Sequence, residues 1–180
     1  RAGRNSWLAP GGVPLYDWLL ALALAVSVLY VPYVFDDLAF RVGNPLRGDF
    51  SSLDYSSARI KLGITGKYRA MILSCGGSMG AQRINEEILA VMRDFTSLRP
   101  DILHIHASGA IEYGAAKKMF SDYGLEKYPN LELCEYIYDM PQKMAAADLV
   151  INRAGSMTLS ELAMQKKPCI LIPSPNVTNN

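Results

Sequence analysis

The glycine-rich stretch that decides the fold is Cys75-Gly76-Gly77-Ser78-Met79-Gly80-Ala81-Gln82-Arg83-Ile84-Asn85. The apolar run at 70–74 before it predicts a buried strand, and apolar residues over 84–92 recur at the spacing of one helix face. In a strand–glycine turn–helix unit, the N–H groups and dipole of the helix start favour an anion such as a phosphate. A tight turn without a ligand fits the short Gly-Gly-Ser-x-Gly pattern equally well, so the pattern alone leaves both open.

The rest of the chain alternates between apolar runs of strand length and amphipathic stretches of helix length. This alternation predicts an α/β fold with a parallel sheet covered on both faces, and right-handed crossovers make it a Rossmann-like doubly wound sheet. We expect strands near 69–75, 102–107, 131–136, 149–152 and 169–173, and helices near 52–62, 81–95, 111–123, 140–147 and 157–165.

A second strand-end loop, Ala154-Gly155-Ser156-Met157-Thr158, follows the strand at 149–152. Ligands of such sheets bind at the carboxyl ends of the strands, so we expect this loop and the glycine turn to face one nucleotide diphosphate. Ser78, Ser156 and Thr158 offer hydroxyl groups there. Glu161 lies three residues after Thr158, a spacing that also fits a capping box in which Glu161 only reaches back to the helix start.

The longer string Gly-Gly-Ser-x-Gly-Ala-Gln-Arg-Ile-Asn resembles the MurG family of bacterial peptidoglycan N-acetylglucosaminyltransferases. Gly43-Asn44-Pro45-Leu46-Arg47 resembles that family's interdomain segment, and the segments at 147–161 and 167–173 match further downstream. The resemblance covers about residues 41–178. It implies the C-terminal half of a GT-B glycosyltransferase, truncated at both ends.

The resemblance also implies which residues bind UDP-N-acetylglucosamine. The family's glutamate at the position of Glu161 accepts hydrogen bonds from the ribose hydroxyls, which suits a carboxylate because it accepts two bonds at once. Arg47 and Ser78 match positions at the diphosphate and sugar, and the backbone at Ile137 matches a contact to uracil. The full expected set is Arg47, Gly77, Ser78, Ile137, Ser156, Met157, Thr158, Leu159, Ser160 and Glu161.

Two segments depart from the family pattern. His106-Ala107-Ser108-Gly109-Ala110 stands where the family often has His-Gln-Thr-Gly-Lys, and Tyr136-Ile137-Tyr138-Asp139-Met140 stands for Phe-Ile-Asp-Asp-Met. Neither change removes one of the expected donor-site residues.

The function implied for the parent protein is transfer of N-acetylglucosamine from UDP-N-acetylglucosamine to lipid I, giving lipid II with inversion. The resemblance places such an enzyme peripherally on the cytoplasmic face of the bacterial cell membrane. It places the catalytic base and the acceptor site in an N-terminal domain, so we expect no catalytic residue, metal or cofactor here and little activity from this chain alone. The alternatives are another GT-B transferase with a lipid acceptor, of the diacylglycerol sugar transferase type, and a non-catalytic nucleotide-sugar-binding partner module.

Composition argues against nucleic-acid binding, disulfide bonds and a metal site. A net charge of +1 over 180 residues gives no electrostatic footprint for nucleic acid. Three cysteines, each in an apolar run, predict small buried thiols kept reduced. His104 and His106 share a strand face, which favours buried histidines over a metal pair because no other ligand accompanies them. Arg83 and Asn85 are expected on a helix surface.

Residues 1–40 fall outside the resemblance. The stretch 18–35 has no charged residue and is a candidate membrane span or signal anchor, although Pro32 interrupts it. The alternative is a helix and a strand left from an N-terminal domain. We therefore expect 1–40 to be a domain remnant or apolar segment, and 41–180 to be an incomplete C-terminal UDP-sugar-binding domain, with both ends cut from a longer protein.

Overall fold

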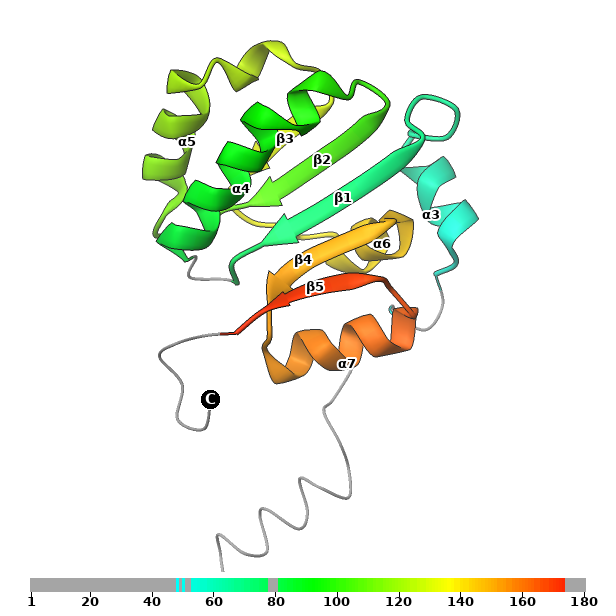
Figure 1. Cartoon of the computed structure of the whole chain (residues 1–180). Helices are drawn as coiled ribbons and strands as arrows, with labels where there is room; N and C mark the ends of the chain where they lie inside the picture. The colour runs from blue at the N-terminus through cyan, green and yellow to red at the C-terminus, as the bar shows by residue number, and fades with distance from the viewer. Residues whose placement is uncertain (1–47, 49, 51–52, 78–80, 174–180) are drawn as a thin grey trace, which may run out of the picture. The chain divides into compact units, whose positions relative to one another are not determined.

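The computed structural model describes residues 48, 50, 53–77 and 81–173. Within them, five parallel strands form one sheet in the order β3-β2-β1-β4-β5 (Figure 1). The predicted parallel, doubly wound sheet is therefore confirmed. The strands are β1 (Ala70–Cys75), β2 (Ile102–Ala107), β3 (Leu131–Cys134), β4 (Leu149–Arg153) and β5 (Cys169–Ile172).

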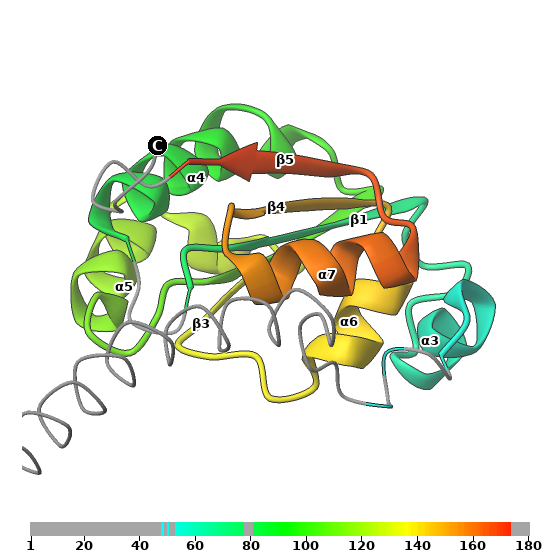
Figure 2. The ribbon, with the colours of Figure 1, turned by 90° about the horizontal axis from the view of Figure 1, so that it is seen from below.

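Helices cover the sheet on both faces (Figure 2). On one face lie α3 (Tyr55–Lys61), α6 (Met140–Ala146) and α7 (Ser156–Gln165), and on the other lie α4 (Gln82–Asp94) and α5 (Tyr113–Asp122). Short 3-10 turns, η1 (Thr96–Leu98) and η2 (Leu125–Lys127), follow α4 and α5. Each predicted strand and helix is present, with ends that differ by a few residues.

The core follows from the alternation of side chains along the central strands. In β1, Met71 and Leu73 pack in the cluster on the α6 side, whereas Ile72 packs on the α4 side. Every residue of β2 is buried, including His104 and His106. The expectation of buried histidines is confirmed. Asn85, expected on a helix surface, is instead 3% exposed on the buried face of α4.

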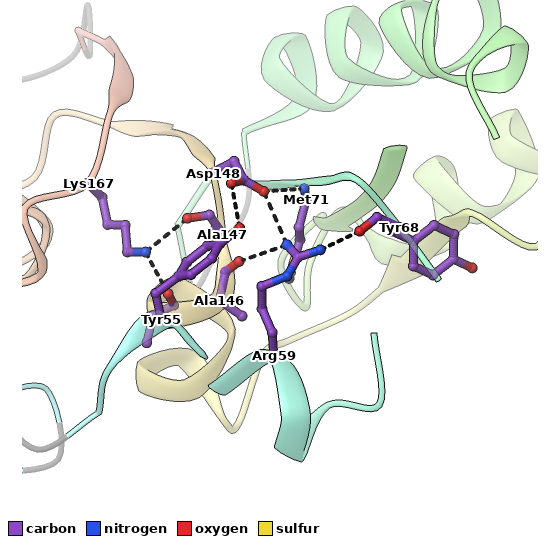
Figure 3. A network of polar contacts seen from close by, with 9 residues as sticks. Tyr55, Arg59, Tyr68, Met71, Ala146, Ala147, Asp148 and Lys167 are labelled. Atoms are coloured by element: carbon purple, nitrogen blue, oxygen red, sulfur yellow. Dashed lines mark hydrogen bonds and ion pairs between the residues drawn. The ribbon is translucent and has the colours of Figure 1, made fainter. Parts of the chain in front are cut away.

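A polar network closes the amino ends of β1 and β4 (Figure 3). The Asp148 carboxylate accepts hydrogen bonds from the Tyr55 hydroxyl at 2.9 Å, the Met71 amide at 2.7 Å and the Arg59 guanidinium at 3.2 Å. Arg59 also donates to the carbonyls of Tyr68 and Ala146. Because Arg59 is 7% exposed, these partners compensate a buried charge that would otherwise be costly.

Lys167 extends this network to the end of α6. Its ammonium group donates to the carbonyls of Ala147, at 2.9 Å, and Ala145. A helix's last carbonyls lack partners within the helix and carry its negative dipole end, so a cation there is stabilising. The loop between α7 and β5 is thereby tied to α6.

The β5 edge of the sheet is much less covered than the centre. Cys169 is exposed, and Ile170 and Leu171 are 51% and 39% exposed although they point to opposite faces. The prediction of a buried thiol is therefore wrong for Cys169, whereas it is right for Cys75. An apolar run at a sheet edge has the same sequence pattern as one in the middle, so sequence does not separate them.

No helix among the residues that the structure describes is long and apolar enough to cross a membrane. The stretch 18–35 and the whole of 1–40 lie outside those residues. Both expectations for this region stay predictions.

Candidate functional site

The two predicted strand-end loops lie side by side. β1 and β4 are neighbours in the sheet, and Cys75 pairs in register with Asn152. The chain leaves β1 toward α4 on one face and leaves β4 toward α7 on the other, so this is the point where the winding of the sheet reverses. A crevice for a ligand is expected there in open parallel sheets.

One pocket opens at this crevice, with a volume of about 160 Å³. Three segments of the chain line it. Gly77 belongs to the glycine turn, Thr158 and Glu161 belong to the first half of α7, and Ile137 belongs to the β3–α6 loop. Its lining consists of Cys75, Gly77, Ala107, Glu135, Tyr136, Ile137, Met140, Asn152, Thr158 and Glu161. Typical ligand pockets span roughly 300–1,000 Å³. The space therefore fits one part of a nucleotide sugar.

Gly77 is the turn residue that most needs to be glycine. Its φ is 96°, a value that side-chain-bearing residues rarely adopt. A Cβ built there meets no atom within 4 Å, so the requirement comes from the backbone conformation and leaves room for a ligand. Ser78 and Arg47, predicted to bind the same ligand, lie outside the described residues.

The start of α7 bears on one of the two interpretations of Glu161, the capping box with Thr158. The helix begins at Ser156, and its N-cap is Gly155, which has no side chain with which to cap the helix. Thr158 is thus inside the first turn and cannot act as an N-cap, so the capping box with Glu161 does not form. Glu161 instead lines the pocket together with Thr158, one helical turn away.

The other predicted residues of this segment do not line the pocket. Met157 and Leu159 are 41% and 39% exposed, and the Ser160 hydroxyl donates to the Ser156 carbonyl at 3.1 Å. The helical period explains part of this division, because residues 158 and 161 lie on one face of α7 and residues 159 and 160 lie away from it. Ser156 lies at the first position of the helix, where main-chain N–H groups make no bonds within the helix.

The charges around the pocket are unusual for an anion site. Its described lining contains two carboxylates, Glu135 and Glu161, and no lysine or arginine. Among these residues, any attraction for an anion must come from main-chain N–H groups and from the positive ends of the α4 and α7 dipoles. The carboxylate of Glu161 fits a neutral hydrogen-bond donor, such as a hydroxyl, better than a phosphate.

Cys75 forms part of the floor of the pocket. Burial raises the pKa of its thiol, as does the nearby Glu161 charge, while hydrogen bonds with Gly77 and Asn152 act in the opposite direction. The thiol is therefore protonated at neutral pH and is a poor nucleophile.

Several lining residues were not predicted from sequence. Cys75, Ala107 and Asn152 end or nearly end their strands, and the rule that ligands bind at strand carboxyl ends would have found them. Glu135 and Tyr136 belong to the loop after β3, and Met140 begins α6. Because β3 lies two strands away from β1, nothing local in the sequence indicates that this segment returns to the crevice.

Comparisons with a family model and with curated proteins point to the same glycosyltransferase family. The sequence model of the glycosyltransferase family 28 C-terminal domain matches residues 71–180. Two curated relatives are UDP-N-acetylglucosamine--N-acetylmuramyl-(pentapeptide) pyrophosphoryl-undecaprenol N-acetylglucosamine transferases. The Acetivibrio thermocellus protein is 42% identical over 139 residues, and the Caldicellulosiruptor saccharolyticus protein is 36% identical over 138. Each alignment covers 77% of this chain and 36% of the relative, so the chain spans little more than a third of their length.

A solved structure supports the fold. The crystal structure of Acinetobacter baumannii MurG matches with a TM-score of 0.56 at 23% sequence identity, over 76% of this chain and 38% of that chain. The match shows a shared fold, in agreement with the sheet order described above.

Proposed function

Because the chain belongs to the glycosyltransferase family 28 C-terminal domain family, we propose that it is the UDP-N-acetylglucosamine-binding half of a two-domain GT-B enzyme. The curated relatives are named for transfer of N-acetylglucosamine to an undecaprenol-linked muramyl peptide. By that relation the whole enzyme converts lipid I to lipid II with inversion, on the cytoplasmic face of the membrane. Residues 41–180 are the donor domain, and 1–40 are a remnant of the other domain or an apolar segment.

The charge distribution suggests how the donor lies in the crevice. The diphosphate faces the main-chain N–H groups of the glycine turn and of the α7 start. Glu161 then accepts hydrogen bonds from the ribose hydroxyls, and the backbone at Ile137 meets the uracil. Arg47 and Ser78 add a cation and a hydroxyl at the diphosphate and sugar.

The same contacts serve the reaction. In a direct displacement at the anomeric carbon, an acceptor hydroxyl loses its proton to a base as the sugar–phosphate bond breaks. Negative charge then builds up on the departing UDP, and fixed N–H groups aimed at it stabilise the transition state. The base and the acceptor site belong to the rest of the enzyme, so this chain alone has little or no transferase activity.

The observation that carries the proposal is the position of Glu161. It lines the same pocket as Gly77, and Thr158 lies inside α7, where it cannot form a capping box with Glu161. The relatives' names do not favour a diacylglycerol-type sugar transferase or a non-catalytic module.

The proposal is tested by calorimetric titration of UDP into wild type, Glu161→Gln and the control Glu126→Gln. Glu126 is an exposed carboxylate on η2, away from the pocket lining. Loss of hydrogen bonds to a charged group costs about 1.5–3 kcal/mol, so Glu161→Gln should weaken UDP binding roughly 10- to 100-fold. Glu126→Gln should bind as wild type does.

A second ligand makes the test specific for ribose. 2′,3′-Dideoxy-UDP lacks both hydroxyls, so it should bind wild type and Glu161→Gln with equal affinity. Equal UDP affinity of wild type and Glu161→Gln would contradict the proposed role of Glu161. Absence of UDP binding by wild type would contradict the proposed function itself.

A further inference from the structure

A row of buried polar side chains runs between the sheet and α4. Its members come from β1, β2, α4 and η1, and none is more than 3% exposed: Ser74, Asn85, Thr96, His104 and His106. None of them lines the pocket. The function proposed above therefore leaves this cluster unexplained.

The distances connect the five side chains into one chain of hydrogen bonds. His104 Nδ1 lies 3.2 Å from Thr96 Oγ1, and His104 Nε2 lies 2.9 Å from Ser74 Oγ. Ser74 Oγ also lies 2.9 Å from His106 Nδ1. His106 Nε2 lies 3.0 Å from Asn85 Oδ1, and Asn85 Nδ2 donates to the Ser108 carbonyl at 3.1 Å.

The Ser108 carbonyl fixes the direction of every bond. A carbonyl only accepts, so the Asn85 amide must turn its NH₂ group to Ser108 and its oxygen to His106. His106 therefore carries its proton on Nε2. Its Nδ1 accepts from the Ser74 hydroxyl at 2.9 Å, a shorter contact than the 3.4 Å from that hydroxyl to the Ile105 carbonyl. Ser74 then accepts from His104 Nε2–H, and His104 Nδ1 accepts from Thr96.

The other neutral tautomer of His106, with its proton on Nδ1, leaves one contact without a hydrogen. His106 Nδ1 also lies 3.2 Å from the Ser74 carbonyl and could donate to it. His106 Nε2 would then face the Asn85 oxygen with no proton between two acceptors, inside a buried interface. Burial also lowers the pKa of His104 to about 3 and that of His106 to about 4, which keeps both rings neutral at pH 7.

The chain ends at the first turn of α4, the helix that follows the glycine turn. The Asn85 amide N–H donates to the Ala81 carbonyl, while its side chain joins the helix to β2 through His106 and to the residue after β2 through Ser108. We propose that Asn85, oriented by two Nε2-protonated histidines, is a positioning residue that holds the start of α4 where its N–H groups meet the ligand's diphosphate. This role rests on the proposed function.

The first test needs no ligand. Long-range ¹H–¹⁵N spectra of the 180-residue chain with labelled histidine distinguish the two neutral tautomers and the cation. At pH 7 both His104 and His106 should show the Nε2–H tautomer. An Nδ1–H tautomer or a cationic ring at His106 would overturn the hydrogen-bond chain.

The second test compares UDP with uridine, which lacks the diphosphate, in wild type and Asn85→Ala. UDP affinity should fall about tenfold, the scale of one lost charge-assisted hydrogen bond, while uridine affinity should stay unchanged. A general loss of stability would not change the ratio of the two affinities in the folded fraction. An unchanged ratio in Asn85→Ala would overturn the positioning role.

Asn130 provides a matched control at the other end of the sheet. It is also a buried asparagine, 2% exposed, and it donates to the carbonyls of Thr96, Arg99 and Ile102. Asn130→Ala should lower stability but leave the UDP-to-uridine ratio as in wild type; an equal drop in the ratio would contradict the proposal.

Ser74→Ala covers the case in which Asn85→Ala does not fold. It removes one hydroxyl from the middle of the chain and should lower the UDP-to-uridine ratio several-fold; an unchanged ratio would count against the proposal. If wild type does not bind UDP, the proposed function and the positioning role both fail. The tautomer spectra still decide whether the hydrogen-bond chain exists.

Discussion

The two ends of the sheet use polar groups in opposite ways. At the amino ends of β1 and β4, charged side chains are satisfied within the protein. Arg59 forms an ion pair with Asp148, Asp148 accepts from the Met71 amide, and Lys167 donates to the Ala147 carbonyl. At the carboxyl ends, a pocket opens between two loops, and its described lining includes Glu161 but no basic residue. The comparison indicates that one end supplies stability and the other is arranged for a ligand.

The histidine chain runs along α4, on the other face of the sheet from α6. It starts at Thr96, which follows the last turn of α4, and it ends at Asn85 in the first turn of the same helix. We therefore expect changes at the amino end to alter stability alone and changes at the pocket to alter ligand binding alone. Changes in the histidine chain are expected to alter both. Substitutions at each place test whether stability and ligand affinity change separately.

The largest effect is expected at the amino end, from Arg59→Met. The change keeps much of the side-chain volume but removes one of the three donors to Asp148 and leaves the carbonyls of Tyr68 and Ala146 without the guanidinium. Each buried acceptor left unpaired costs about 1–3 kcal/mol. Urea unfolding should show this loss, while the UDP affinity of the folded protein stays as in wild type. Arg69→Met is the control, because Arg69 pairs with Asp101 while 72% exposed and should change stability by less than about 1 kcal/mol. Similar losses in both variants would contradict the role assigned to Arg59.

A loss of stability on the same scale is expected in acid. His104 and His106 have pKa values lowered by burial to about 3 and about 4, whereas both have about 6.5 when unfolded. Below pH 6.5 the unfolded chain therefore binds protons that the folded chain excludes. The free energy of unfolding is highest above pH 6.5 and falls as pH drops toward 4, by up to about 1.4 kcal/mol per pH unit for each histidine.

Urea unfolding between pH 7.5 and pH 4.5 measures this slope. His106→Gln should reduce it by about half, because one of the two titrating groups is gone. Equal unfolding free energies at pH 7 and pH 5 in wild type would show that the histidines are not held neutral by the fold.

The smallest effect is expected at the carboxyl end, from Tyr138→Ala. Tyr138 is 86% exposed, and its ring meets the edge of Tyr136, a pocket residue, with centroids 5.0 Å apart. Such a pair contributes about 0.5–1.5 kcal/mol, so UDP binding should weaken roughly 2- to 10-fold with the melting temperature unchanged. Tyr138→Phe keeps the ring contact and should bind as wild type. A lowered melting temperature with unaltered UDP affinity would show that Tyr138 supports stability and not ligand binding.

The fold was predictable from sequence because its signals are local. The glycine turn and the alternation of apolar runs with amphipathic stretches gave each strand and helix to within a few residues. The side-by-side position of Gly77 and Thr158 also followed, since it depends only on strand order and on the carboxyl-end rule.

Other features depend on contacts between distant segments. Arg59 is buried among partners from distant segments, among them Asp148, 89 residues later. Asn85 looked like a surface residue because a polar residue on a helix is usually solvated. Its partners are His106 in β2 and Ser108 just after β2, more than 20 residues later. Glu161 matched a capping-box spacing from Thr158, but α7 begins two residues before Thr158. No pattern in the sequence separates these cases.

The central claim is that the loops after β1 and β4 hold one nucleotide diphosphate between them. Titration of UDP into the ¹⁵N-labelled chain, followed by ¹H–¹⁵N spectra, tests it directly. The amide signals of Gly76, Gly77 and residues 155–158 should shift together with a single dissociation constant, while those of 55–61 in α3 stay fixed. Shifts confined to one loop, or different dissociation constants for the two loops, would contradict the claim.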